Sequence, residues 1–150
     1  MNLVFRKAIP EDTPGCIDLR GRTRENAFSA EQLAALGITL DSWRAGIADG
    51  SLPGHVAAVD GELAGYCFGD RDTGEIVVLA LLPAFEGMGI GKRLLDLVVE
   101  EFRARGFEKL FLGCSYDPGV RSYGFYRHLG WKPTGAVDGA GDEVLEYFLS

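Results

Sequence analysis

The sequence is poor in the residues that build disulfide frameworks and metal sites. Its 150 residues include three cysteines and two histidines. Cys16, Cys67 and Cys114 are far apart, and an odd number of dispersed cysteines argues against both a disulfide framework and a zinc site. We therefore expect three buried thiols and no metal.

Positive charge is also scarce, and long apolar runs are missing. The formal net charge is −7, whereas a protein that binds nucleic acid usually carries a basic surface. No apolar stretch approaches the roughly 18 residues that a membrane-spanning helix requires. In residues 1–7 the charges follow the apolar residues and no long apolar core is present, which is not the pattern of a signal peptide. The expected protein is cytoplasmic and binds neither nucleic acid nor a membrane.

What the sequence does contain is the composition of a globular domain. Apolar residues make up 47% and charged residues 25% of the chain, and a chain of this length can bury a full core. No repeat, linker or low-complexity segment divides it, which predicts a single domain over residues 1–150.

Hydrophobic periodicity predicts a mixture of strands and helices. Asp60-Gly61, between two apolar segments, is the strongest hairpin signal, because type I′ turns favour this dipeptide. A right-handed crossover through the helix that begins near residue 90 would make strand 109–115 parallel to the strand that begins at Glu75. The expected strands are 3–9, 54–60, 62–69, 75–83, 109–115, 132–137 and 144–149, and the expected helices are 11–24, 29–48 with a division at Gly37, 90–105 and 120–129.

The most informative segment is the apolar run 75–83, which is followed by Gly87, Gly89 and Gly91 and then by a helical pattern. Consecutive N–H groups in a glycine-rich turn bind anions, and the start of a helix adds a partial positive charge. This order of strand, turn and helix indicates a phosphate-binding cradle. A Rossmann turn would lie near the N-terminus with an acidic residue after it, and a P-loop would need a hydroxyl residue where Arg93 stands.

Two segments resemble motifs of one enzyme family. Glu86-Gly87-Met88-Gly89-Ile90-Gly91 resembles the acyl-CoA signature Gln/Arg-x-x-Gly-x-Gly/Ala of the GNAT superfamily of N-acetyltransferases, except at its first position. Phe125-Tyr126-Arg127-His128-Leu129-Gly130-Trp131 resembles the family's Phe-Tyr-x-x-x-Gly-Phe/Trp motif. The resemblance implies the GNAT acyl-CoA N-acyltransferase fold, which is an α/β (α+β) architecture. Its mixed central sheet has roughly six to seven strands, two of them parallel and splayed, flanked by about four helices.

The resemblance also implies how acetyl-CoA would bind, without a metal. The backbone of residues 79–81 would pair with the pantetheine arm between the splayed strands, and the turn at 88–92 would hold the pyrophosphate. Lys92 could add a charge-assisted contact or point to solvent. Glu86 should turn outward, because phosphates repel a carboxylate. The expected cofactor-binding residues are Leu79, Ala80, Leu81, Glu86, Gly87, Met88, Gly89, Ile90, Gly91 and Lys92.

Acetyl transfer to an amine requires an unprotonated nitrogen. A lysine-like amine with a pKa near 10.4 is neutral only about once in 2,500 molecules at pH 7, so a base or a water relay must remove a proton. Glu75 stands where the resemblance implies a general base, eleven residues before Glu86. It could equally be a solvated residue at a strand end, and Asp70 or Asp72 could act through water.

Tyr126 matches the family tyrosine that donates a hydrogen bond or a proton to the departing CoA sulfur. Because free tyrosine has a pKa near 10 and a thiol near 8.5, full proton transfer in solution is uphill by about 2 kcal/mol. A hydrogen bond to the developing thiolate is therefore the expected role. The alternative is that Tyr126 is a core residue, like Tyr123 one turn earlier.

The acceptor should meet the polar segment 20–28, in which Arg24 and Asn26 are the expected substrate-binding residues. The arginines there could bind a carboxylate of the acceptor or form a solvated face. The expected function is transfer of the acetyl group of acetyl-CoA to a primary amine, of a small molecule rather than a protein, by direct attack in a ternary complex. The alternatives are a non-catalytic acyl-CoA-binding or sensing domain and a protein N-terminal acetyltransferase. The chain could also form a homodimer.

Overall fold

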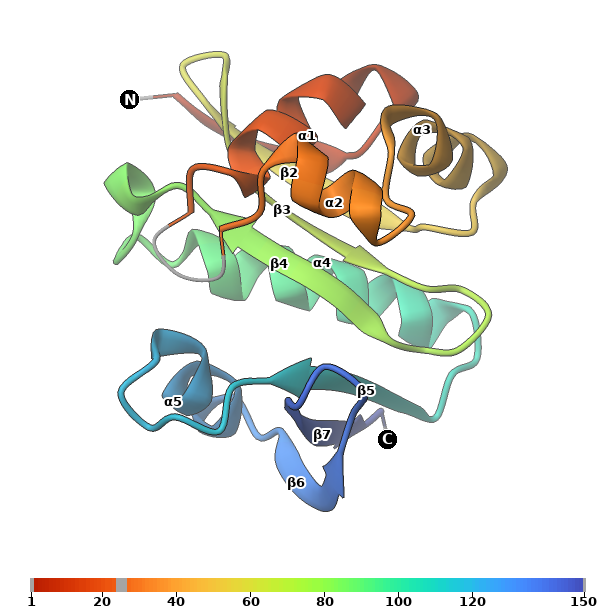
Figure 1. Cartoon of the computed structure of the whole chain (residues 1–150), viewed down its shortest axis with the longest axis vertical. Helices are drawn as coiled ribbons and strands as arrows, with labels where there is room; N and C mark the ends of the chain where they lie inside the picture. The colour runs from red at the N-terminus through yellow and green to blue at the C-terminus, as the bar shows by residue number, and fades with distance from the viewer. Residues whose placement is uncertain (1, 24–26, 150) are drawn as a thin grey trace.

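The computed structural model of the chain describes residues 2–23 and 27–149. In this part of the chain, seven strands form two antiparallel sheets, one of four strands and one of three. Figure 1 shows the four-stranded sheet in the upper part of the molecule, the three-stranded sheet below it, and helices in front of and behind the upper sheet. The line along which the two sheets meet positions the candidate site.

The four-stranded sheet has the order β1-β2-β3-β4, with each neighbouring pair antiparallel. The β2–β3 turn confirms the hairpin prediction, because Asp60 and Gly61 have φ angles of 51° and 83°, in the left-handed region that a type I′ turn requires. The strands are β1 (Leu3–Lys7), β2 (Gly54–Val59), β3 (Glu62–Gly69) and β4 (Ile76–Leu81).

Short helices cover one face of this sheet. α1 ends at Arg20 with Gly21 as its C-cap, so the predicted helix 11–24 is shorter than expected. The predicted division near Gly37 is confirmed, because Thr39 caps a new helix by accepting a hydrogen bond from the N–H of Ser42. The elements of this layer are the 3-10 turn η1 (Pro10–Asp12), α1 (Thr13–Arg20), α2 (Ala30–Ala35) and α3 (Leu40–Asp49).

An aromatic cluster fixes these helices to the sheet. Trp43 of α3 packs edge to face on Tyr66 and Phe68 of β3, with ring centroids 5.6 Å apart in both pairs. The Tyr66 hydroxyl donates a hydrogen bond of 3.2 Å to the backbone carbonyl of Cys16 in α1. α1 and α3 are thus both anchored on β3, and α1 also contacts β4.

α4 (Ile90–Ala104) covers the opposite face of the same sheet. Its predicted apolar stripe is buried and consists of Leu94, Leu95, Val98, Val99 and Phe102. Phe102 lies directly over Gly69 of β3, where a side-chain Cβ would come within 2.3 Å of its ring. The glycine therefore allows the C-terminal part of α4 to lie close against the sheet.

The second sheet has the order β5-β7-β6. Its elements begin and end within one or two residues of the predicted positions. They are β5 (Lys109–Cys114), α5 (Arg121–His128), β6 (Lys132–Val137) and β7 (Glu143–Phe148). Cys114 in β5, like Cys16 and Cys67, is buried and free, as the sequence predicted.

β4 and β5 are parallel and splayed. Among the described residues, one parallel bridge joins the two sheets, between Glu75 and Phe111, and the Phe111 N–H donates a 3.2 Å hydrogen bond to the carbonyl of Gly74. Beyond this vertex the strands diverge, as Figure 1 shows. The splayed pair implied by the sequence resemblance is therefore present.

A bulge in β4 lies next to the vertex. Ile76 pairs with Gly69 and Val78 pairs with Phe68, so Val77 is an extra residue in β4. Side chains in a strand alternate between the two faces of the sheet. Because of the extra residue, this alternation changes by one position between the start of β4 and the end that lines the cleft. In the described parts of the chain, no helix has the length and apolar character needed to cross a membrane.

Candidate functional site

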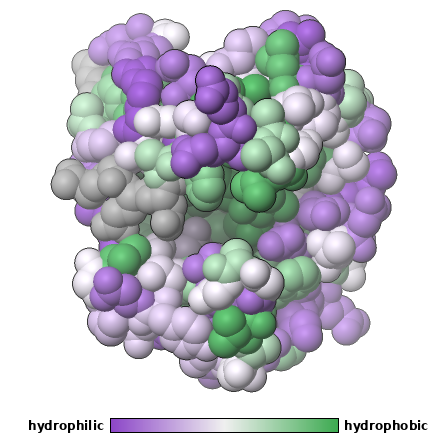
Figure 2. Space-filling model, in the orientation of Figure 1, coloured by the Kyte–Doolittle hydropathy of each residue, from purple (hydrophilic) through white to green (hydrophobic). Residues whose placement is uncertain are grey.

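A cleft of about 250 Å³ lies between β4 and α5, on the open side of the splayed strands. Figure 2 shows this face of the molecule hollowed between its upper and lower parts, with hydrophobic side chains in the hollow. All of the predicted cofactor-binding residues except Met88 line the cleft, together with Arg20, Thr23, Arg121, Ser122, Phe125 and Tyr126.

One wall of the cleft is the free edge of β4. The N–H of Leu82 donates a hydrogen bond to the carbonyl of Ala64 in β3. Because backbone groups alternate in direction along an antiparallel strand, Leu79 and Leu81 direct their N–H and C=O groups away from β3 and toward the cleft. An extended ligand that carries amide groups, as pantetheine does, could pair with this edge as an added strand would.

The glycine-rich turn forms the end of the cleft. Gly87 and Gly89 have φ angles of 80° and 77°, a conformation that residues with side chains rarely adopt. A Cβ added at either position would meet no other atom within 4 Å, so the space beside both glycines is open. Gly89 is the N-cap of α4, and the first N–H groups of this 15-residue helix have no partner within the helix. The turn therefore fits an anion such as a phosphate.

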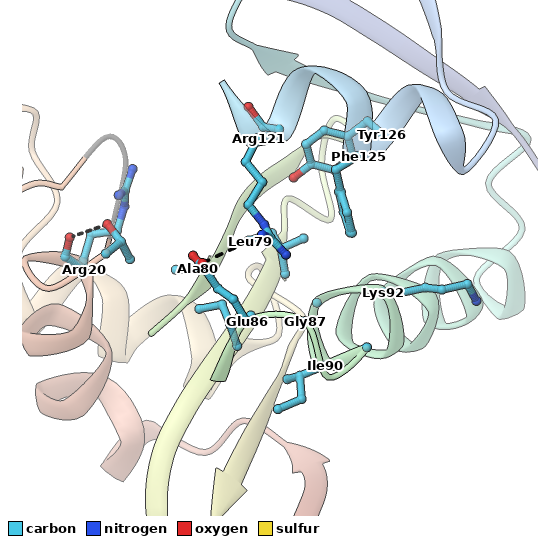
Figure 3. A pocket seen from close by; sticks show the side chains of 15 residues that line it. Arg20, Leu79, Ala80, Glu86, Gly87, Ile90, Lys92, Arg121, Phe125 and Tyr126 are labelled. Atoms are coloured by element: carbon cyan, nitrogen blue, oxygen red, sulfur yellow. Dashed lines mark hydrogen bonds and ion pairs between the residues drawn. The ribbon is translucent and has the colours of Figure 1, made fainter. Parts of the chain in front are cut away.

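Two residues of the predicted cradle point elsewhere. Met88 is 39% exposed and does not line the cleft. The Lys92 ammonium forms an ion pair with Asp96 one turn along α4, at 2.9 Å, and Figure 3 shows the side chain directed along the helix away from the cleft. Of the two orientations left open for Lys92, the structure has the one that points away from the cradle.

The expectation that Glu86 turns outward was wrong. Its side chain is only 14% exposed, and Oε1 lies 3.8 Å from Nη1 of Arg121, the first residue of α5. The positive charge of Arg121 on the other side of the cleft attracts the carboxylate and stabilises its inward orientation. Figure 3 shows the two side chains reaching toward each other from opposite sides.

Tyr126 belongs both to the core and to the cleft wall. It is 8% exposed, and its ring packs edge to face on Phe125 and Trp131, with centroids 5.1 and 6.0 Å away. Burial, followed by the nearby thiols of Cys67 and Cys114, raises the pKa of the Tyr126 hydroxyl far above its usual value. The hydroxyl is therefore always protonated near neutral pH and can act only as a hydrogen-bond donor or acceptor there.

The helix that carries Tyr126 is fixed to the sheet by its neighbour. The guanidinium of Arg127 forms an ion pair with Glu143 at the start of β7. The same guanidinium lies over the ring of Tyr123, 3.7 Å from its centroid, and donates a 3.2 Å hydrogen bond to the Tyr123 carbonyl. These contacts fix α5 to the start of β7.

Glu75 lies at the vertex of the splayed strands and does not line the cleft. Burial raises the pKa of its carboxyl, and the charges of Asp70 and Asp138 add to the effect. The Asp70 carboxylate accepts a 2.8 Å hydrogen bond from the Asp72 N–H, which stabilises the turn before β4. Glu75 and Tyr126 therefore lie at different levels of the splayed strands, and the cleft lining includes only Tyr126.

A sequence model of the acetyltransferase (GNAT) family matches residues 16–131. The chain belongs to this family. A mycothiol acetyltransferase from Beutenbergia cavernae is 36% identical over 65 residues, which are 43% of this chain and 22% of that protein. The match thus spans about a fifth of the length of that relative.

Two crystal structures resemble the whole fold. The PaiA N-acetyltransferase from Thermoplasma acidophilum, in complex with coenzyme A, has a TM-score of 0.83 at 21% identity, over 99% of this chain and 100% of that one. A putative acetyltransferase of the GNAT family from Desulfovibrio desulfuricans has a TM-score of 0.75 at 25% identity, over 99% of both chains.

Within this GNAT chain, two arginines that line the cleft lie outside the two motifs. Arg20 belongs to the polar segment that was expected to meet the acceptor, whereas Arg121 was not among the predicted site residues. Arg20 at the end of α1 lies over the ring of Phe28, 4.8 Å from its centroid, and burial lowers the pKa of its guanidinium. Arg121 follows the Pro118-Gly119 pair at the start of α5. The available signal for Arg121 was its position four residues before Phe125, where the second motif begins. The predicted substrate-binding residues Arg24 and Asn26 lie outside the described residues.

Proposed function

We propose that this protein is an acetyl-CoA-dependent N-acetyltransferase that transfers the acetyl group to a primary amine of a small molecule. The observation that carries the proposal is the combination of a free strand edge, an open glycine turn and a buried tyrosine in one cleft. Membership of the acetyltransferase (GNAT) family supports the same reaction.

In this proposal the edge of β4 holds the pantetheine arm through Leu79 and Leu81, and the turn at 87–91 holds the pyrophosphate. Both sites offer backbone N–H groups, which the strand and the start of the helix already hold in place. No group of three or more His, Cys, Asp or Glu side chains among the described residues could hold a metal ion. The outward-facing backbone of Leu79 and Leu81 and the open glycine turn fit the amide and phosphate groups of coenzyme A.

The reaction is a direct attack of the amine nitrogen on the thioester carbonyl carbon. A new C–N bond forms, the C–S bond breaks, and the electron pair of that bond leaves with the sulfur. Tyr126 donates a hydrogen bond to the developing thiolate and stabilises its charge. The nitrogen loses a proton, and Glu75, which does not line the cleft, accepts it through water. A raised pKa suits Glu75 to this role, because a stronger base near neutral pH accepts a proton more readily.

Two experiments test the proposal. First, acetyl-CoA should raise the midpoint of thermal unfolding of the purified chain. At 100 times Kd the stabilisation is about 2.7 kcal/mol, or about 5–10 °C for a chain of this size. Second, thiol release from acetyl-CoA should be screened with small amines, diamines, amino acids and short peptides as acceptors.

Gly91→Val tests the cradle without straining the backbone, because Gly91 does not have a left-handed φ and a Cβ there would lie 3.7 Å from the nearest atom, in Phe125. The added side chain should fill the space of the phosphates and remove the thermal shift. Gly124→Val is the matched control, since Gly124 is also helical, has open space beside it and does not line the cleft. An unchanged shift in Gly91→Val would refute the cradle.

The screen distinguishes the remaining functions. A thermal shift with acetyl-CoA but no thiol release with any amine would indicate an acyl-CoA-binding or sensing domain. Release with peptide N-termini alone would indicate a protein N-terminal acetyltransferase. Release with a small amine supports the function proposed above.

A further inference from the structure

Glu86 and Arg121 form an ion pair across the mouth of the cleft. Glu86 lies between the 3-10 turn η2 (Pro83–Phe85) and α4, on the side of the four-stranded sheet, and Arg121 is the first residue of α5, on the side of the three-stranded sheet. The carboxylate is only 14% exposed and the guanidinium 56%. Both residues line the cleft, and Figure 3 shows the line between them crossing from one side of it to the other.

This pair lies away from the vertex at which the two sheets are joined. The splayed strands are joined at their vertex by the Glu75–Phe111 bridge, and the Glu86–Arg121 pair joins the two sides at the open end. In residues 2–23 and 27–149 no other ion pair links the two sides, because the pairs Lys109–Glu146 and Arg127–Glu143 lie within the lower one. A ligand bound between β4 and α5 would therefore share the cleft with this pair.

The Glu86 carboxylate lies beside an anion-binding turn, where it would repel a bound phosphate. Glu86 immediately precedes Gly87, and both residues line the cleft. A phosphate in the cradle would therefore lie close to the Glu86 carboxylate. Like charges repel more strongly in a partly buried site than in bulk water. Arg121 neutralises Glu86 in the free protein, and its exposed guanidinium is the cationic group best placed to reach an anion from the α5 side.

We propose that Glu86 and Arg121 act as a clasp, in which cofactor phosphates draw Arg121 away from Glu86 and thereby open the mouth of the cleft. Arg121 is thus a positive determinant of cofactor affinity, and Glu86 is a negative one that weakens binding and favours release of the product. This inference rests on the proposed function, because it requires a phosphate-bearing cofactor in the cleft.

A double-mutant cycle measures the two effects separately. Arg121→Gln leaves the Glu86 charge facing the phosphates and should raise the Kd of acetyl-CoA about tenfold. Glu86→Gln removes the repulsion and weakens the attraction that holds Arg121 toward position 86, and should lower the Kd about threefold. The double variant should bind within about threefold of the wild type. All shifts should shrink as ionic strength rises, because salt screens these charges.

Matched controls exclude a general effect of net charge. Arg103→Gln and Glu100→Gln change the charge by the same amounts within an exposed ion pair near the far end of α4, away from the cleft. Neither should alter the Kd measurably. A second probe, S-acetylpantetheine, carries the thioester arm but no phosphate. Its Kd, measured by competition with acetyl-CoA, should not rise in Arg121→Gln and fall in Glu86→Gln.

The measurements distinguish a failure of the clasp proposal from a failure of the proposed function. If the wild type does not bind acetyl-CoA, the proposed function fails. If it binds but both single variants shift the Kd in the same direction, the pair is a structural brace and the clasp is refuted. Opposite shifts that persist with S-acetylpantetheine would also refute it, because the phosphates would then not be the cause. Thermal unfolding of each variant without ligand verifies that it is folded.

Discussion

Replacing Tyr126 with phenylalanine removes one hydroxyl and leaves the ring. The ring contacts with Phe125 and Trp131 involve no hydroxyl, so the core around position 126 should keep its packing. The change therefore tests the hydrogen bond to the departing sulfur with little disturbance of the fold. Tyr123→Phe is a suitable control, because Tyr123 lies in the same helix, packs against Arg127 and does not line the cleft.

The expected magnitude follows from the environment of the hydroxyl. A hydrogen bond to a charged group contributes about 1.5–3 kcal/mol, which corresponds to a fall in turnover of roughly 10- to 150-fold. Burial raises the pKa of Tyr126 well above its usual value, so the hydroxyl stays protonated from pH 6 to pH 10. The ratio of wild-type to variant turnover should therefore be constant over this range.

The assay is initial-rate thiol release from acetyl-CoA with the best acceptor from the amine screen, measured at intervals from pH 6 to pH 10. Acetyl-CoA affinity is titrated separately and should change little in the Tyr126 variant. Wild-type turnover in Tyr126→Phe would refute a role at the leaving group and leave the tyrosine as a core residue. A ratio that falls toward one at alkaline pH would instead mean that Tyr126 assists deprotonation of the amine.

Two further predictions concern other parts of the site. Glu75→Gln should lower turnover by about 10²- to 10⁴-fold at neutral pH, with partial recovery at high pH where the acceptor loses its proton unaided; wild-type rates throughout would transfer the base role to water or another carboxylate. Because the folded-state pKa of Glu75 is raised, its ionisation costs stability as the pH rises, so the Gln variant should gain stability relative to the wild type between pH 4 and pH 8, measured by thermal unfolding. Gly65→Ala would bring a Cβ within 2.8 Å of the Ala80 carbonyl and of Leu81. It should cost about 1–3 kcal/mol, lowering the unfolding midpoint by about 2–12 °C, and should weaken acetyl-CoA binding by displacing β4; unaltered stability would contradict the tight packing there.

Local signals in the sequence predicted the parts of the fold that depend on neighbours in the chain. The Asp60-Gly61 turn follows from the conformations that these two residues tolerate. The buried stripe of α4 and the open glycine turn before it follow from residue spacing. Even the orientation of Lys92 could have been predicted, because Asp96 stands four residues later on the same helix.

Contacts between distant segments could not be predicted in the same way. Glu86 was expected to turn outward because phosphates repel a carboxylate. Its partner Arg121 could not be predicted, because Arg121 is far along the chain and lies on the opposite side of the cleft. The relation of Glu75 to the cleft depends on the extra residue Val77, whose bulge shifts the alternation of β4. α1 ends at Arg20, and its C-cap Gly21 keeps a right-handed conformation, so the sequence carried no left-handed glycine signal for this end.

The free edge of β4 also has a consequence for the solubility of the folded protein. An unpaired strand edge is a template on which another chain can add a strand and begin to aggregate. Here α5 stands beside Leu79 and Leu81, so a strand from another molecule would collide with it, although a narrow ligand can enter. At the outer edge of the lower sheet, β6 is exposed but contains Pro133, which lacks an N–H for pairing. Local unfolding of α5 would therefore expose β4 as an aggregation site.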